Sequence, residues 1–248
     1  LLAVHDIAAR DLADDEGMMQ LMVDSGFNQV FVGIETPEEA SLSECNKRQN
    51  RGRDLVANVK RIQRAGLEVQ GGFIVGFDHD TPTIFERQIE FIQQSGIVTA
   101  MVGLLQAIPG TKLYQRLKAQ DRLIGQTSGD NVDGTINFIP QMNPEKLRQG
   151  YRRLMKHLYS PGPYYARIRT FLREYRPPQI ARGLNWRSLV AFGRANLCLG
   201  ILGRERFHYW GLLFWTCFRY PSYVPLAVTF SVYGHHFRRT CVELNRCL

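Results

Sequence analysis

The sequence lacks the common spacings of metal-binding cysteines. Neither C-x-x-C nor C-x-x-x-C-x-x-C occurs in the 248 residues, so the chain contains no evident zinc or iron–sulfur motif. The cysteine count is odd and the spacing irregular, which argues against a disulfide framework and favours a reducing, cytoplasmic setting. The five cysteines are Cys45, Cys198, Cys217, Cys241 and Cys247.

Motifs that mark phosphate-binding and serine-hydrolase sites are also missing. The chain has neither G-x-G-x-x-G nor G-x-x-x-x-G-K-[ST], and it has no G-x-S-x-G. No signal or transit peptide is visible in residues 1–15, and the chain begins with Leu1 instead of Met. We therefore expect a processed chain or a fragment of a longer protein.

Charge divides the chain into two parts. Residues 1–121 carry 12 basic and 17 acidic side chains, whereas residues 122–248 carry 19 basic and 6 acidic ones. The net charges are −5 and +13, and all three tryptophans lie in the second part. This shift predicts two regions with different roles.

The apolar pattern of the first 120 residues predicts alternating helices and strands. Apolar residues recur at helical spacing in some segments, and short β-branched runs follow them. Because the two kinds of segment alternate, we expect parallel strands with crossover helices between them. The predicted helices span residues 13–25, 53–65, 81–96 and 112–119, and the predicted strands span residues 27–35, 67–77 and 99–107.

Each predicted strand ends in polar or glycine-rich residues. Glu35 ends the first strand, the glycine-rich stretch GGFIVGFDHDTP at residues 71–82 follows in the second, and Gln106 lies near the end of the third. Ligands of parallel α/β folds bind at the carboxyl ends of strands. We therefore expect Glu35, Gly76 and Gln106 to share one rim.

Polar segments are predicted to connect these elements. Asp78-His79-Asp80 is expected to form a turn, because adjacent loop residues seldom converge on one metal ion. Thr81-Pro82 is expected to cap and start the next helix. Residues 120–142 are rich in Gly, Asp and Asn and predict a long surface loop or lid. Beyond residue 143 the pattern is helical.

The aromatic region at residues 210–234 allows three interpretations. The first is a buried helix pair, the second is a membrane-surface face with arginine toward anionic lipid, and the third is a nucleic-acid contact. The apolar stretches on either side of Arg219 are short for a spanning helix, and no nucleic-acid recognition motif is present. We favour the buried pair, keep the membrane surface as an alternative, and expect no nucleic-acid partner.

Several of these segments together resemble the cobalamin-binding radical S-adenosylmethionine (SAM) enzymes, with the hopanoid methylases as similar relatives. FVGIET at residues 31–36, GGFIVGFDHDTP and LLQAIPGTKLYQRL at residues 104–117 are similar to the fourth, fifth and sixth strand motifs of that family. Residues 128–140, 150–178 and 233–239 are similar to its C-terminal extension of unknown function. Residues 1–11 match poorly at the place where another strand is expected.

The resemblance implies roles for particular residues. Glu35 would contact the ribose and amino-acid part of SAM, and the strand from Gly72 to Gly76 would lie against adenine and bond it through its backbone. Gln106 would line the same cavity, and Asp78 or Asp80 loosely matches the family's loop acid. The expected cofactor-binding residues are Glu35, Gly72, Phe73, Ile74, Gly76 and Gln106.

The resemblance also defines what this chain is missing. The family holds a [4Fe–4S] cluster on a C-x-x-x-C-x-x-C loop and carries an upstream cobalamin domain, and this sequence contains neither. We expect a fragment that is inactive alone, from an enzyme that uses SAM, the cluster and cobalamin on a small-molecule or lipid-like substrate. The alternative is a non-enzymatic binding module that docks a membrane surface or protein partner through its cationic region.

The expected fold is α/β. It is a partial (β/α) barrel of the radical SAM type, truncated at its N-terminus and followed by a mostly helical C-terminal region. The barrel part is predicted at residues 1–120, the loop or lid and the helices of the extension at 121–178, and a basic aromatic helical region at 179–248. We expect a cytoplasmic protein that is peripheral to the membrane if it contacts one.

Overall fold

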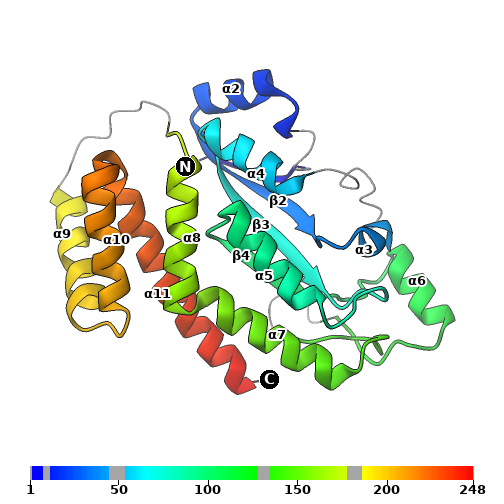
Figure 1. The fold of residues 1–248 in the computed structure, drawn as a ribbon. Helices are drawn as coiled ribbons and strands as arrows, with labels where there is room; N and C mark the ends of the chain where they lie inside the picture. The colour runs from blue at the N-terminus through cyan, green and yellow to red at the C-terminus, as the bar shows by residue number, and fades with distance from the viewer. Residues whose placement is uncertain (1, 8–11, 45–53, 128–133, 178–185, 248) are drawn as a thin grey trace.

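The computed structural model describes residues 2–7, 12–44, 54–127, 134–177 and 186–247, and it shows an α/β unit joined to a group of helices (Figure 1). The strands are β1 (Leu2–Ile7), β2 (Phe27–Glu35), β3 (Glu68–Val75) and β4 (Ala100–Leu104). The helices are α2 (Glu16–Asp24), α3 (Glu39–Glu44), α4 (Leu55–Arg64), α5 (Ile84–Ser95), α6 (Lys112–Ala119), α7 (Pro144–Tyr159), α8 (Pro161–Glu174), α9 (Trp186–Ala195), the π-helical η2 (Asn196–Ile201), α10 (Arg206–Arg219), the 3₁₀ turn η3 (Pro221–Tyr223) and α11 (Val224–Cys247).

The four strands form one parallel sheet in the order β1-β2-β3-β4. The predicted parallel arrangement of the three later strands is confirmed, and so is the mostly helical C-terminal region. The strand expected within residues 1–11, where the resemblance is weak, is present as β1, which runs parallel to β2. The sequence pattern does not predict β1, since His5 and Asp6 interrupt its short apolar run.

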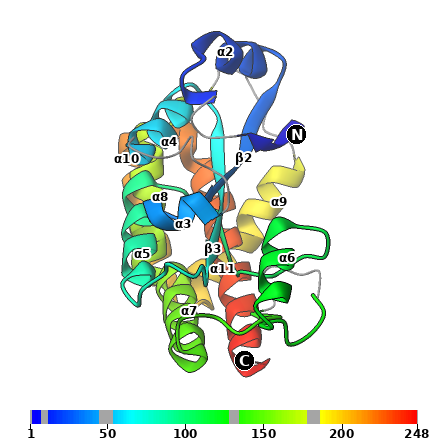
Figure 2. The ribbon, with the colours of Figure 1, turned by 90° about the vertical axis from the view of Figure 1, so that its right-hand side faces the viewer.

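Helices α4 and α5 cover one face of the sheet (Figure 2). Along β3, Val69, Gly71, Phe73 and Val75 are buried, whereas the residues that alternate with them are half-buried and lie on the opposite face. Phe73 meets Phe91 of α5 edge to face, with ring centroids 5.9 Å apart. The period of two therefore assigns one face of β3 to the core and the other to a potential site.

Helix α5 starts later than the sequence predicts. The N–H of Ile84 donates to the carbonyl of Thr81 at 2.9 Å, so Thr81 and Pro82 belong to a turn that precedes the helix. Thr83 is the N-cap residue, and the prediction that Thr81 caps the helix is wrong. The predicted end is confirmed, because Gly96 adopts a left-handed φ of 72° at the C-cap.

The outer edge of β4 is closed by side chains of α7 and α8. The hydroxyl of Tyr151 donates to the carbonyl of Val102 at 3.0 Å, and that of Tyr159 donates to the carbonyl of Ala100. Arg167 of α8, which is 1% exposed, donates to the carbonyl of Val98 at 3.3 Å. These donors satisfy carbonyls that a neighbouring strand would otherwise pair, so the helices end the sheet at this edge.

Two glycines allow the C-terminal helices to pack closely. A Cβ atom on Gly150 of α7 would lie 2.1 Å from the ring of Phe85 on α5. A Cβ atom on Gly234 of α11 would lie 2.2 Å from the ring of Tyr164 on α8. These two glycines therefore let α7 pack closely against α5, which covers the sheet, and let α11 pack closely against α8. Among the described helices, none is long and apolar enough to cross a membrane.

Candidate functional site

Three glycines on neighbouring strands share one face near the carboxyl end of the sheet. Gly33 of β2 is paired with Gly72 of β3, and Gly72 is paired with Met101 of β4. Gly103 lies two residues after Met101 and therefore points to the same face. Because none of the three glycines has a side chain, the sheet offers a flat strip of backbone here.

A pocket of about 360 Å³ lies over this glycine strip. This volume is within the usual range for small-molecule sites. Its polar side chains are Glu35 and Gln106, and the rest of the wall is apolar or backbone. The pocket is lined by Phe31, Gly33, Glu35, Gly72, Phe73, Ile74, Met101, Gly103, Leu104, Leu105, Gln106 and Ile108.

The pocket contains all but one of the residues singled out from the sequence. Glu35 at the end of β2, Gly72 within β3 and Gln106 just after β4 meet around one cavity, together with Phe73 and Ile74. Their role in binding a cofactor stays a prediction. The sixth residue, Gly76, does not line the pocket.

The backbone at Glu35 is strained. Its φ is +65°, a left-handed value that residues other than glycine seldom adopt. The N–H of Thr36 donates to the carbonyl of Ile34 at 2.9 Å, which closes a three-residue turn around Glu35. This turn interrupts the pairing of β2 with β3 between Gly33 and Glu35. Backbone strain of this kind is common at functional sites, and here it occurs at Glu35, which supplies the carboxylate of the pocket wall.

Gln106 is held by the segment that the sequence predicts to be a loop or lid. Its Nε2 donates to Thr135 Oγ1 at 3.2 Å, and its Oε1 accepts a hydrogen bond from the hydroxyl of Thr127. Asn137 pairs with the backbone of Ala107, accepting from its N–H at 2.8 Å and donating to its carbonyl at 2.9 Å. Both described arms of residues 120–142 therefore contact the two residues Gln106 and Ala107 that follow β4, while residues 128–133 lie outside the described part.

The acidic residues after β3 organise the loop. Asp80 is 6% exposed, and its Oδ2 accepts from the N–H groups of Gly76 and Phe77 at 2.8 and 3.1 Å. The hydroxyl of Ser41 donates to its other oxygen at 2.8 Å. Asp80 thus ties the exit of β3 to α3, which is a structural role that the sequence alone does not reveal.

Asp78 is paired with two arginines. Arg122 Nη2 lies 2.7 Å from its Oδ1, and Arg116 Nη2 lies 3.2 Å from its Oδ2. The hydrogen bond from Arg122 is the main cause that holds the pKa of Asp78 below its usual range. Within the described residues, no group of three or more His, Cys, Asp or Glu side chains is placed to hold a metal ion.

Three glycines of the 71–76 stretch have three different uses. Gly72 faces the pocket, where an added Cβ would lie 2.9 Å from Cζ of Phe31. Gly71 faces the core, where an added Cβ would lie 2.7 Å from Cε2 of Phe73. Gly76 has a φ of +106° and packs near Leu147 of α7, so it turns the chain out of the strand.

A second carboxylate lies on the same face at the opposite end of β3. Glu68 is the first residue of this strand, and its side chain is half-buried. Burial raises the pKa of its carboxyl to about 7. Because Glu68 and Glu35 share a sheet and a residue type but lie at opposite strand ends, Glu68 is a natural control for Glu35.

Sequence reasoning singled out Phe73 and Ile74 but missed the other apolar residues of the wall. Phe31, Met101 and Gly103 follow from strand parity, because they alternate with core residues and pair with or flank Gly72. Ile108 lies beyond the end of β4, and no periodic signal in the sequence indicates it. The arrangement is suited to a flat, apolar ring over the glycine strip, with a polar group of the ligand near Glu35.

The C-terminal half of the chain has a protein-family match. A family model described as a domain of unknown function (DUF4070) matches residues 111–247. It covers the loop that holds Gln106 and the helices from α7 to α11.

Curated relatives match a larger share of the chain. An uncharacterized methyltransferase of Synechocystis sp. is 34% identical over 235 residues, which cover 93% of this chain and 44% of that protein. The hopanoid C-2 methylase of Rhodopseudomonas palustris is 28% identical over 218 residues, covering 82% of this chain and 39% of that protein. The bacteriochlorophyllide d C-12(1)-methyltransferase of Chlorobaculum tepidum is 27% identical over 169 residues, covering 68% of this chain and 34% of that protein. The chain spans less than half the length of each of these relatives.

Proposed function

This chain belongs to the cobalamin-dependent radical SAM family, and on that premise we propose that it supplies the adenosine-binding part of the SAM site of a methyltransferase. The observation that carries the proposal is the glycine strip of Gly33, Gly72 and Gly103 with Glu35 at its rim. SAM bound here would supply the 5′-deoxyadenosyl group, and the methyl group that the relatives' names imply is transferred would come from a second molecule of SAM.

The residues present fit the nucleoside part of SAM. An adenine ring needs a flat apolar surface, and the glycine strip gives one beside the ring of Phe31. A ribose needs hydrogen-bond acceptors at its hydroxyl groups, and the Glu35 carboxylate lies in the same wall. Gln106, held by Thr135, adds an amide to the rim. In this proposal these residues bind and orient the nucleoside.

The residues present do not fit an iron–sulfur cluster. The 248 residues contain no C-x-x-x-C-x-x-C loop. The cysteines whose side chains the structure describes are Cys198, Cys217 and Cys241, and they lie on η2, α10 and α11, away from the ends of the strands. We therefore propose that the cluster and cobalamin of the whole enzyme are held by residues outside these 248, and that the parallel sheet is part of a larger radical SAM barrel.

We propose an apolar, lipid-like acceptor for the methyl group. The support is the similarity to a hopanoid methylase and the aromatic surface of the C-terminal helices, described below. The acceptor would enter near Ile108, at the half-exposed side of the pocket.

Glu35→Gln is expected to weaken SAM binding to this chain about tenfold or more, because the neutral amide loses a charge-assisted hydrogen bond to the ribose. The measurement is equilibrium dialysis of radiolabelled SAM against the purified chain. S-adenosylhomocysteine and 5′-methylthioadenosine should compete, since both keep the nucleoside.

The control is Glu68→Gln, which makes the same substitution at the far end of β3, where the raised pKa leaves the carboxyl partly protonated near neutral pH, and it should leave the affinity unchanged. Equal affinity in the Glu35→Gln variant would remove Glu35 from the site. Absence of any SAM binding by the unmodified chain would contradict the proposed function.

The chain alone is expected to form no 5′-deoxyadenosine from SAM, because it has no loop to hold the cluster that delivers the electron. The measurement is anaerobic reconstitution with iron and sulfide, followed by reductant, SAM and chromatography of the products. A reconstituted radical SAM enzyme that carries the cysteine loop serves as the positive control. Formation of 5′-deoxyadenosine by this chain above the buffer blank would overturn the expectation.

A further inference from the structure

Helix α10 has apolar side chains on its outward face. Its inward face buries Tyr209, Leu212 and Leu213, as a surface helix should. The outward residues Phe207, Phe214 and Phe218 are 78%, 56% and 89% exposed. They lie seven and four residues apart, so they form one stripe along the helix. We call these three residues the phenylalanine stripe. A helix that only covered a core would be polar at these positions.

The turn that leads into α10 extends this apolar surface. Ile201 and Leu202, just before it, are 60% and 72% exposed. Arg204 and Arg206 precede Phe207, and the guanidinium of Arg206 lies 5.1 Å from the centroid of the Phe207 ring. Cations and a large apolar side chain therefore lie side by side at the start of α10, where α9, η2 and α10 form a helical hairpin beside α11 (Figure 1).

The surrounding sequence has almost no negative charge. Residues 175–242 contain nine arginines and a single acid, Glu205. Glu205 is 5% exposed and is paired with Arg238 and His235, so it does not offset the exposed arginines. Arg194, Arg204, Arg206 and Arg219 are all exposed. Exposed aromatic rings with arginines and no accessible acid are complementary to an anionic lipid surface.

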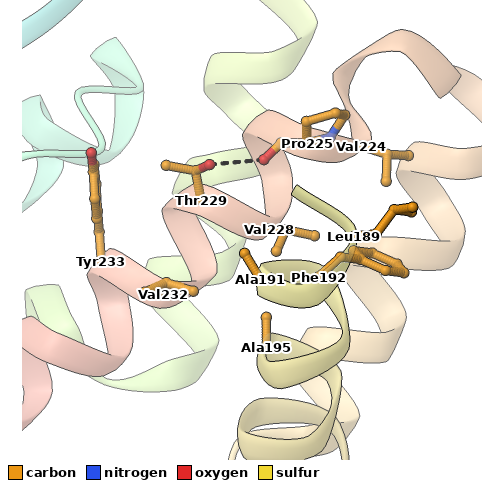
Figure 3. Close-up of a pocket in the computed structure, with 10 residues that line it drawn as sticks. All are labelled: Leu189, Ala191, Phe192, Ala195, Val224, Pro225, Val228, Thr229, Val232 and Tyr233. Atoms are coloured by element: carbon orange, nitrogen blue, oxygen red, sulfur yellow. Dashed lines mark hydrogen bonds between the residues drawn. The ribbon is translucent and has the colours of Figure 1, made fainter. Parts of the chain in front are cut away.

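A pocket between α9 and α11 adds an apolar hollow to the same group of helices (Figure 3). Its volume is about 480 Å³, and Leu189, Phe192, Val228 and Val232 are among its lining residues. The hydroxyl of Thr229 donates to the carbonyl of Pro225 at 2.9 Å, and Tyr233 carries the other polar side-chain group of a lining that is otherwise apolar. A hydrocarbon chain is the chemistry that this hollow suits.

We propose that the helices α9 to α11 dock on an anionic membrane surface through the phenylalanine stripe and its flanking arginines. The rings enter the interface between headgroups and acyl chains, and the arginines contact lipid phosphates. The inference goes beyond the proposed function and does not depend on it, because none of these residues lines the SAM pocket.

The test is flotation of the chain with vesicles of phosphatidylcholine alone or with about a third of phosphatidylglycerol. We expect binding to the anionic vesicles, and a loss of it at about 1 M salt, where the Debye length is about 3 Å. The triple variant Phe207→Ser, Phe214→Ser, Phe218→Ser should bind about tenfold or more weakly. Arg204→Gln, Arg206→Gln, Arg219→Gln should lose the preference for anionic vesicles.

The matched control replaces three apolar residues of similar exposure on other parts of the molecule, Leu21→Ser, Ile124→Ser, Ile139→Ser. This variant should float as the unmodified chain does, and unchanged thermal unfolding of both triple variants would show that the fold is intact. Equal flotation with the neutral vesicles, or equal loss in both triple variants, would overturn the proposal. Sedimentation velocity without lipid tests whether the phenylalanine stripe instead binds a second copy of the chain. A dimer that the phenylalanine variant converts to a monomer would mean that it does, and that result would also overturn the proposal. SAM affinity measured on the same variants should not change, which separates this proposal from the proposed function.

Discussion

The variant Gly234→Ala is expected to unfold with a free energy about 2–4 kcal/mol lower than that of the unmodified chain, because it overpacks a closed part of the core. The added Cβ would lie 2.2 Å from Cε1 of Tyr164, whose side chain is fully buried. Tyr164 cannot move away cheaply. Its hydroxyl donates to the carbonyl of Phe230 at 2.8 Å, and the guanidinium of Arg167 lies 5.2 Å from its ring centroid.

Urea unfolding followed by circular dichroism measures this loss. The matched control is Gly193→Ala in α9, where a Cβ would have no atom within 4 Å. There alanine should raise the free energy of unfolding by up to about 1 kcal/mol, since only the helix propensity changes. If the two variants were equally stable, α11 and α8 would not approach as closely as the structure shows.

The variant Gly72→Val is expected to reduce SAM affinity about 100-fold or more while changing the free energy of unfolding by about 1 kcal/mol or less. Valine suits a strand, and its side chain would occupy the glycine strip on which the adenine ring is proposed to lie. The nearest atom, at 2.9 Å from the added Cβ, is the far end of the Phe31 ring, which borders the pocket and has room to shift.

The control for this variant is the neighbouring glycine on the other face of β3. In Gly71→Ala the new Cβ meets Phe73 at 2.7 Å and Ile97 at 3.1 Å, both in the core. We expect a loss of stability of about 1–3 kcal/mol, with the SAM affinity of the folded protein retained. Full SAM affinity in Gly72→Val would mean that the pocket over the glycine strip is not the nucleoside site.

Much of the sheet could be predicted from the sequence because its signals are local. The apolar runs of β2, β3 and β4, with helices between them, specify parallel strands whose ends meet at one edge. That topology alone places Glu35 and Gln106 near each other, although 70 intervening residues separate them in the chain. The turn at Asp78-His79-Asp80 follows equally from local chemistry.

The remainder depends on contacts between distant residues. Nothing in the sequence distinguishes Asp80 from other acidic loop residues, because its role depends on hydrogen bonds from the backbone N–H groups of Gly76 and Phe77. Gly76 reads like Gly72 in sequence, yet its positive φ and its packing near Leu147 place it outside the pocket. The hydrogen bond between Gln106 and Thr135 joins residues that are 29 positions apart, and the segment between them has no hydrophobic periodicity that would predict it.

The closure of β4 by Tyr151, Tyr159 and Arg167 has a consequence for assembly. In the described part of the chain, β1 is the strand at the other edge of the sheet. Growth of the sheet is therefore directional. An additional strand, whether from the same polypeptide or from another, must join beside β1. The helices α7 and α8 prevent a strand from pairing with β4 at the other edge of the sheet.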